Sequence, residues 1–182
     1  MLYTRKGDNG TTKTFGCDQK ISKSSAVAEA LGALDECNSF LGICKTNAEA
    51  GKPLSEGKSF LELIDWIQQN LFIAQAHIAG ADKTITKEKI KHMEAAIDMI
   101  EKEMPPIKTF FISGGTTLAA HFDFARTLAR RAERKIVGVS KQEGAKIDPM
   151  ILVFLNRLSS LLYAAARLVN FRAGVKENPP SY

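Results

Sequence analysis

Five basic side chains lie within ten positions, and their spacing suits an anion. The stretch reads Arg126-Thr-Leu-Ala-Arg130-Arg131-Ala-Glu133-Arg134-Lys135. Arg126, Arg130 and Arg134 recur every four residues, so on a helix they project in a row from one side. Stacked guanidinium groups repel one another unless an anion lies across them, and their paired donors match phosphate and carboxylate. A solvated face with ordinary i,i+4 ion pairs is the alternative, although only Glu133 lies within the run to neutralise it.

A second candidate for anion binding is the N-terminal segment, which mixes glycines, hydroxyls and cations. Amides freed by glycine, together with hydroxyls and cations, suit a polyphosphate. A frayed, solvated terminus is the alternative. The residues concerned are Thr4, Arg5, Lys6, Gly7, Asp8, Asn9, Gly10, Thr11, Thr12 and Lys13.

Composition favours a soluble globular protein. The chain has 182 residues, 45% hydrophobic content and a formal charge of +5, which permits an anionic ligand without demanding nucleic acid. No apolar run reaches membrane-spanning length and the N-terminus is unlike a signal peptide, so we expect a cytoplasmic protein without membrane contact. Cys17, Cys37 and Cys44 fit no metal spacing, and we expect Cys37 and Cys44 to be buried thiols in a reducing compartment.

These residues must be positioned by helices, because apolar residues recur at three- and four-residue steps and strand alternation is absent. Helices are predicted over about 24–44, 59–79, 87–103 and 116–141, and from 148–149 onward. Ser24 or Ser25 can cap the first helix, with Glu29 in a capping box. We therefore expect an all-α five-helix bundle. The predicted organisation is a single domain over 1–182, comprising a phosphate-binding loop (1–23), the bundle (24–171) and a C-terminal tail (172–182).

Several single residues stand out within these elements. Asp35 lies in mid-helix, where its propensity is poor, so it either has a partner or faces solvent. His77 is expected to be structural. Phe110 and Phe111 form either a core plug or a flat platform for a ligand. Asn156, between bulky apolar residues, is expected to be partly buried and hydrogen-bonded.

Read together and in order, six patches resemble the PduO-type ATP:cob(I)alamin adenosyltransferases. The resemblance covers nearly the whole chain, and the ordered set is specific where no single patch is. The patches are Thr4-Arg-Lys-Gly-Asp-Asn-Gly-Thr-Thr12, Ile21-Ser-Lys23, Leu34-Asp-Glu36 followed by Asn38-Ser39, Phe110-x-x-x-Gly-Gly115, Arg126-x-x-x-Arg-Arg-Ala-Glu-Arg134, and Leu155-Asn-Arg-Leu-Ser159.

The resemblance implies a five-helix bundle assembled as a homotrimer, with ATP bound between subunits. It implies transfer of the 5′-deoxyadenosyl group to the cobalt of cobalamin, with triphosphate leaving. Mg²⁺ would be bound through the ATP phosphates rather than by a site of protein ligands alone. The ATP-binding residues implied are Thr4, Arg5, Lys6, Gly7, Asp8, Gly10, Thr12, Lys13 and Lys23, completed by Arg130, Arg131, Glu133, Arg134 and Asn156.

The catalytic residues implied are Arg126, Arg130, Asp35 and Phe110. Asp35 resembles the family's carboxylate partner for Arg126 across the subunit interface. Phe110 matches the aromatic near the corrin, where an apolar wall would displace the lower axial ligand and ease reduction of Co(II). The chain departs from the family at Asn9, where Lys is frequent, at Lys6, where a small residue is common, and in a slightly longer loop before the last helix.

Two other function classes fit parts of the sequence. One is a non-catalytic module that holds or delivers ATP or adenosylcobalamin. The other is a nucleic-acid-binding bundle, which the modest charge and the interleaving of the basic patch with the core stripe argue against. As further partners the resemblance implies a reductase that supplies Co(I) and an adenosylcobalamin-dependent enzyme, and we expect no nucleic acid.

Overall fold

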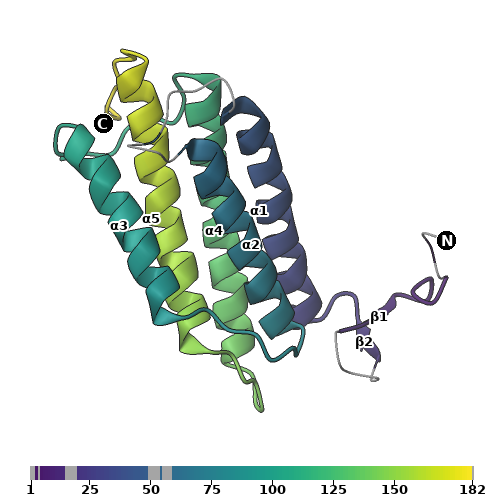
Figure 1. Cartoon of the computed structure of the whole chain (residues 1–182). Helices are drawn as coiled ribbons and strands as arrows, with labels where there is room; N and C mark the ends of the chain where they lie inside the picture. Colours follow the sequence, from purple (N-terminus) through teal and green to yellow (C-terminus); the bar gives the residue numbers. More distant parts are fainter. Residues whose placement is uncertain (1–2, 4, 15–19, 49–53, 55–58, 182) are drawn as a thin grey trace.

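The computed structural model describes residues 3, 5–14, 20–48, 54 and 59–181. Within these residues five helices lie side by side as a bundle (Figure 1). The prediction of a five-helix, mainly α protein is confirmed. The helices are α1 (Ala26–Ala48), α2 (Phe60–Ile78), α3 (Lys87–Glu103), α4 (Thr117–Ser140) and α5 (Pro149–Arg172).

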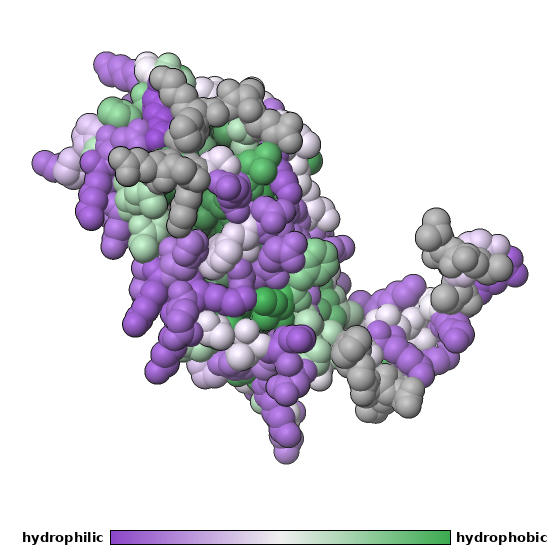
Figure 2. Space-filling view, viewed as in Figure 1, coloured by the Kyte–Doolittle hydropathy of each residue, from purple (hydrophilic) through white to green (hydrophobic). Residues whose placement is uncertain are grey.

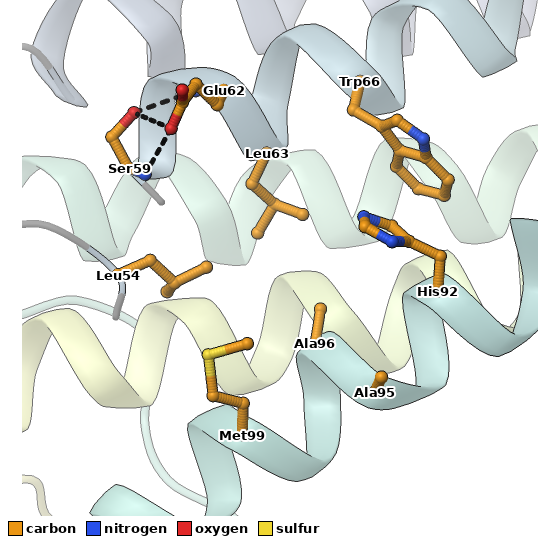
Figure 3. Close-up of a pocket in the computed structure, with 9 residues that line it drawn as sticks. All are labelled: Leu54, Ser59, Glu62, Leu63, Trp66, His92, Ala95, Ala96 and Met99. Carbon is orange, nitrogen blue, oxygen red and sulfur yellow. Dashed lines mark hydrogen bonds between the residues drawn. The ribbon is translucent and has the colours of Figure 1, made fainter. Parts of the chain in front are cut away.

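The starts of α2, α4 and α5 follow from their caps. Ser59 and Glu62 form the reciprocal capping box of α2, drawn in Figure 3. The Thr116 hydroxyl accepts from the amide of Ala119 at 3.2 Å. The Asp148 carboxylate accepts from the amide of Met150 at 2.9 Å, while Pro149 takes the first helical position. These contacts satisfy amides that the first helical turn leaves unpaired.

The first helix has the predicted serine cap, but it differs from the prediction in its capping box and in its C-terminal end. Ser25 caps it through the Ala28 amide at 3.3 Å. The expected capping box is wrong, because Glu29 is the fourth helical residue and instead binds Lys135 of α4 at 2.8 Å. The helix also continues past Cys44 to Ala48, which is buried. Ala48 follows Cys44 by four positions, so it extends the same apolar stripe.

The N-terminal segment contains two short strands, which the sequence analysis did not predict. Strand β1 (Thr11–Lys13) pairs antiparallel with β2 (Lys20–Ser22), with Thr12 opposite Ile21. Three residues are too few to show alternation over the four to eight positions that mark a strand. The hairpin projects from the bundle beside the start of α1 (Figure 1), and hydrophilic side chains cover most of its visible surface (Figure 2).

The core lies where α4 packs on both α1 and α5, with α2 added beside α1 and α3 beside α5. Cys37 and Cys44 are buried free thiols, as predicted, and burial raises the pKa of each to about 12. Contrary to the sequence analysis, α5 has the length and composition of a membrane span, with an 18-residue window of mean hydropathy 1.4. Because 56% of this window is buried inside the bundle, the helix acts here as the central core helix.

His77 has the structural role expected of it. Its Nε2 accepts from the amide of Asp148 at 3.0 Å, and its Nδ1 lies 2.8 Å from the carbonyl of Lys83. The imidazole therefore ties the loop after α2 to the cap of α5.

Candidate functional site

The hairpin and the turn before it form a pocket of about 630 Å³ lined by glycine, hydroxyls and ammonium groups. The pocket wall packs closely on Gly7, since a Cβ there would lie 3.2 Å from both the Lys23 ammonium and the Thr11 carbonyl, which is tighter than ordinary contact. The amide of Lys23 also donates to the carbonyl of Gly10 at 2.9 Å, which joins the two ends of the hairpin. The lining residues are Lys6, Gly7, Thr11, Thr12, Lys13, Lys20 and Lys23.

Five of these seven were proposed from the sequence as ATP-binding, and the pocket brings them together. Lys20 was missed. It lies opposite Lys13 in the hairpin, a relationship that follows only from the pairing of β1 with β2. Arg5, Asp8 and Gly10 belong to the preceding segment and are not among the described residues that line the pocket, and Thr4 lies outside the described residues.

A second cavity, of about 450 Å³, lies among α3, α4, α5 and the loop between α3 and α4. It brings together three residues proposed as catalytic: Phe110, Arg126 and Arg130. Apolar and aromatic side chains form much of the rest of its wall, so two guanidinium groups face a partly apolar space. The other lining residues are Ile97, Glu101, Ile107, Phe111, Ser113, Asp123, Ser159, Ser160, Tyr163 and Ala164.

Phe110 is not a core plug. Its side chain is 79% exposed although it lines this cavity, so it stands at the rim. Arg126 lies deeper, and its buried Nε has no hydrogen-bond partner in the described part of the chain. A buried donor without a partner costs stability, so this Nε has a hydrogen bond to offer to another group.

The basic face of α4 is partly neutralised by α1 rather than by its own helix. Arg131 forms an ion pair with Glu36, and Lys135 forms one with Glu29. The Lys135 hydrogen bond lowers the pKa of Glu29. Neither pair has the i,i+4 spacing expected if this were a solvated face with ion pairs within one helix. Arg130 and Arg134 remain exposed and carry the positive charge of this face.

Asn156 joins α5 to α4. Its Nδ2 donates to Oε1 of Glu133 at 3.2 Å, and its Oδ1 accepts from Nη1 of Arg157 at 3.0 Å. The expected hydrogen bonds are present, but the expected burial is wrong because Asn156 is exposed. Its carboxamide lies on the outer edge of the helix, beyond the apolar residues that flank it in sequence.

Asp35 is exposed on α1 and forms no hydrogen bond or ion pair with Arg126 in the described part of a single chain. Both alternatives from the sequence, an external partner and plain solvent exposure, therefore stay open for Asp35.

A third cavity, of about 370 Å³, lies between α2 and α3 (Figure 3). Trp66 and His92 pack against each other at one end of it, with ring centroids 4.7 Å apart. Leu63, Ala96 and Met99 make its wall apolar, and no Lys or Arg is among its described lining residues. It is unsuited to a triphosphate for that reason. Among the described residues there is also no group of three or more His, Cys, Asp or Glu side chains that could hold a metal ion.

The chain matches known proteins over almost its full length. The family model described as cobalamin adenosyltransferase matches residues 2–169. A corrinoid adenosyltransferase of Bacillus subtilis is 38% identical over 178 residues, covering 96% of this chain and 89% of that protein. The corrinoid adenosyltransferase PduO of Citrobacter freundii is 37% identical over 173 residues, covering 91% of this chain. The chain spans only 49% of the length of that second relative.

Solved structures give the same result. A phenylalanine-to-histidine variant of a PduO-type ATP:corrinoid adenosyltransferase from Lactobacillus reuteri, complexed with cobalamin and ATP, superposes with a TM-score of 0.88 at 30% identity. The match covers 99% of this chain and 96% of that one. An arginine-to-lysine variant from the same organism, complexed with ATP, gives 0.87 at 30% identity, covering 99% and 100% of the two chains. By its family model and its relatives, this chain belongs to the cobalamin adenosyltransferase family.

Proposed function

We propose that this protein transfers the 5′-deoxyadenosyl group of ATP to the Co(I) of a corrinoid. The observation that carries the proposal is the cavity in which Arg126 and Arg130 meet the exposed ring of Phe110. The two cations can stabilise the negative charge of the phosphates, and the apolar wall can pack against the flat macrocycle of the corrinoid. The family, and relatives complexed with cobalamin and ATP, support the same activity.

The reaction is a displacement at carbon. The electron pair of Co(I) attacks C5′ of ATP, the cobalt–carbon bond forms, and the C5′–oxygen bond breaks with its electrons passing to triphosphate. Negative charge therefore collects on the leaving group. Fixed cations and amide donors stabilise such charge most effectively when they are already in place. Mg²⁺ bound through the phosphates would add to this stabilisation, with no ligand set of its own from the protein.

We assign the triphosphate to the hairpin pocket. Lys6, Lys13, Lys20 and Lys23 surround it with ammonium groups, and Thr12 adds a hydroxyl. Arg130, Arg131 and Arg134 of α4, with Glu133 and Asn156, would complete the ATP site. Glu36 forms an ion pair with Arg131, and Asn156 donates a hydrogen bond to Glu133. The side chains of Arg131 and Glu133 are therefore oriented before the nucleotide binds.

We infer that the site is completed by a neighbouring subunit, as in a cyclic homotrimer. The hairpin pocket and the cavity on α4 share no lining residue, and the hairpin points away from the bundle (Figure 1). A second copy would let one subunit's lysines approach the other's arginines. It would also supply the exposed Asp35 to the buried, unpartnered Nε of Arg126.

We assign to Phe110 the role of excluding the lower axial ligand of the corrinoid. An aromatic ring cannot coordinate cobalt, and it displaces the water that would. Losing an axial donor makes Co(II) easier to reduce to the attacking Co(I) state. We propose that residues 1–182 form one domain and act in the cytoplasm, where a separate reductase supplies the electron and an adenosylcobalamin-dependent enzyme receives the product.

The function can be tested by following the absorption spectrum of the corrinoid. Reduced cob(I)alamin mixed with MgATP and the protein should lose its Co(I) absorption band as adenosylcobalamin forms, and triphosphate should appear in equal amount. No change beyond that of a protein-free sample, with both ligands shown to bind, would indicate a non-catalytic binding or delivery module instead.

A further inference from the structure

The loop that carries Phe110 is held by groups outside it. The amide of Ile112 donates to the carbonyl of Asn178 at 3.0 Å, in the segment after α5. The amide of Gly114 donates to Oδ2 of Asp123, in α4, at 3.3 Å. Since Ile112 lies only two residues from Phe110, the C-terminal segment bears on the position of that ring.

Asn170, near the end of α5, binds the same loop on both sides. Its Nδ2 donates to the carbonyl of Gly114 at 2.8 Å, and its Oδ1 accepts from the amide of Thr116 at 2.9 Å. The approach is so close that a Cβ on Gly115 would lie 2.3 Å from this oxygen. Nδ2 also contacts Oε1 of Glu177 at 2.6 Å, so the C-terminal segment and the loop share one side chain.

Arg167, in α5, contacts two of these groups, Asp123 and Glu177. Its guanidinium is only 2% exposed and donates to Oδ2 of Asp123 at 2.6 Å. Its Nε lies 3.0 Å from Oε1 of Glu177 at ion-pair distance, although without hydrogen-bond geometry. The guanidinium also lies over the rings of Phe111, at 5.9 Å, and Tyr163, at 4.9 Å.

We propose that Arg167, acting through Asp123 and Glu177, is a positioning residue that sets Phe110 at the rim of the cavity. The C-terminal segment Val175–Asn178 forms one side of this support. Arg167 is a buried cation that faces one carboxylate from α4 and one from the C-terminal segment. Its attraction to the second carboxylate holds the segment in place against the bundle. The role assigned to the ring itself rests on the proposed function.

Glu177 is the residue to change. Arg167 and Asp123 are both buried. Removing Arg167 leaves the buried carboxylate of Asp123 without its cation, and removing Asp123 takes the hydrogen-bonded partner from Arg167 and the acceptor from the amide of Gly114, so both changes destabilise the fold. Glu177→Ala instead leaves Asp123 to neutralise Arg167, while removing the link from the segment to both Arg167 and Asn170. Lys176→Ala, at the exposed neighbouring position, is the matched control.

The first readout needs no ligand. Amide hydrogen exchange in the full-length protein should speed up by about tenfold or more at Ile112, Gly114 and Thr116 in Glu177→Ala, because local opening costs less there. Amides of α2 should be unaffected, and Lys176→Ala should match the unmodified protein. Glu177→Gln should recover part of the protection, since its amide oxygen can still accept from Asn170. Unchanged exchange in Glu177→Ala would overturn the proposal.

The second readout follows the corrinoid. With cob(II)alamin and MgATP bound, Glu177→Ala should retain more axially ligated Co(II) in its electron paramagnetic resonance spectrum. Its kcat should fall by about tenfold from Co(II) and much less from Co(I), with KM for ATP nearly unchanged. Equal losses from both starting states in a folded variant would reject the positioning role. If the unmodified protein does not turn over, the proposed function is wrong. The hydrogen-exchange experiment still tests whether Glu177 and Arg167 hold the loop in place.

Discussion

Asn156 of α5 donates to Glu133 of α4 at 3.2 Å, and this bond holds two of the residues assigned to ATP side by side on the bundle surface. Since both side chains belong to rigid helices, the carboxylate of Glu133 is oriented without help from a ligand. Pre-organised groups of this kind bind at a lower entropic cost.

The first prediction concerns this pair. Asn156→Ala should raise KM for ATP by about tenfold, equivalent to ~1.4 kcal/mol, and leave the melting temperature nearly unchanged because the side chain is exposed. Steady-state kinetics and a thermal melt measure both. Asn47→Ala, which removes a half-buried carboxamide whose hydrogen bonds lie within α1, is the control. An equal rise in KM in both variants would show that the effect is not local.

The second prediction concerns Asp35 and Arg126, which form no hydrogen bond or ion pair with each other in the described part of one chain. If they meet across subunits, Asp35→Asn and Arg126→Ala should each reduce activity, and the double variant should lose less than the sum, with a coupling of about 0.5–3 kcal/mol. Asp98→Asn, at another exposed acidic position, should have no effect. Light scattering gives the assembly state. Strict additivity would mean that the two side chains do not touch.

The third prediction concerns the hairpin pocket. Lys23→Ala or Lys20→Ala should raise KM for ATP and leave cobalamin binding nearly unchanged, because both ammonium groups line the pocket. MgATP should also slow proteolysis before residue 24. Lys176→Ala is the control for the loss of one surface charge. A cleavage rate that is the same with and without MgATP would contradict the assignment.

The fourth prediction separates the chemistry of Phe110 from its packing. Since the ring is 79% exposed, Phe110→Ala should change stability by only about 0.5 kcal/mol. It should reduce kcat from Co(II) by about tenfold or more, or ~1.4 kcal/mol, and reduce it less when Co(I) is supplied. Phe171→Ala, another exposed aromatic position, should affect neither rate. Equal losses from Co(II) and Co(I) would reject the axial-ligand role.

The fifth prediction is a pH dependence of stability. Hydrogen bonds from the Thr84 hydroxyl and the Met150 amide lower the pKa of Asp148. The carboxylate therefore stabilises the fold at pH values above its unfolded pKa of about 3.9, and that contribution is lost as pH falls through the lower folded pKa. Asp148→Asn should keep much of the cap yet lose this part of the acid dependence. Denaturant unfolding between neutral pH and pH 3 measures it, and parallel curves for the two proteins would contradict it.

The sequence alone determined the helices, because their signals are local. Pro105-Pro106 ends α3, Ser59 with Glu62 begins α2, and Pro149 begins α5 at the expected positions. The ordered motifs also pointed to the family that the comparisons support. The hairpin strands escaped detection because a pairing of three residues leaves no periodic pattern. The roles assigned to individual site residues remain predictions.

Only the tertiary structure decided which charges meet. Glu36 and Arg131 are separated by 95 positions, and Glu29 and Lys135 by 106; no spacing rule links residues so far apart. The same holds for Arg167, which the fold buries between Asp123 and Glu177. Helix periodicity fixes the face from which a side chain projects, whereas packing decides which helix, loop or C-terminal segment lies against that face.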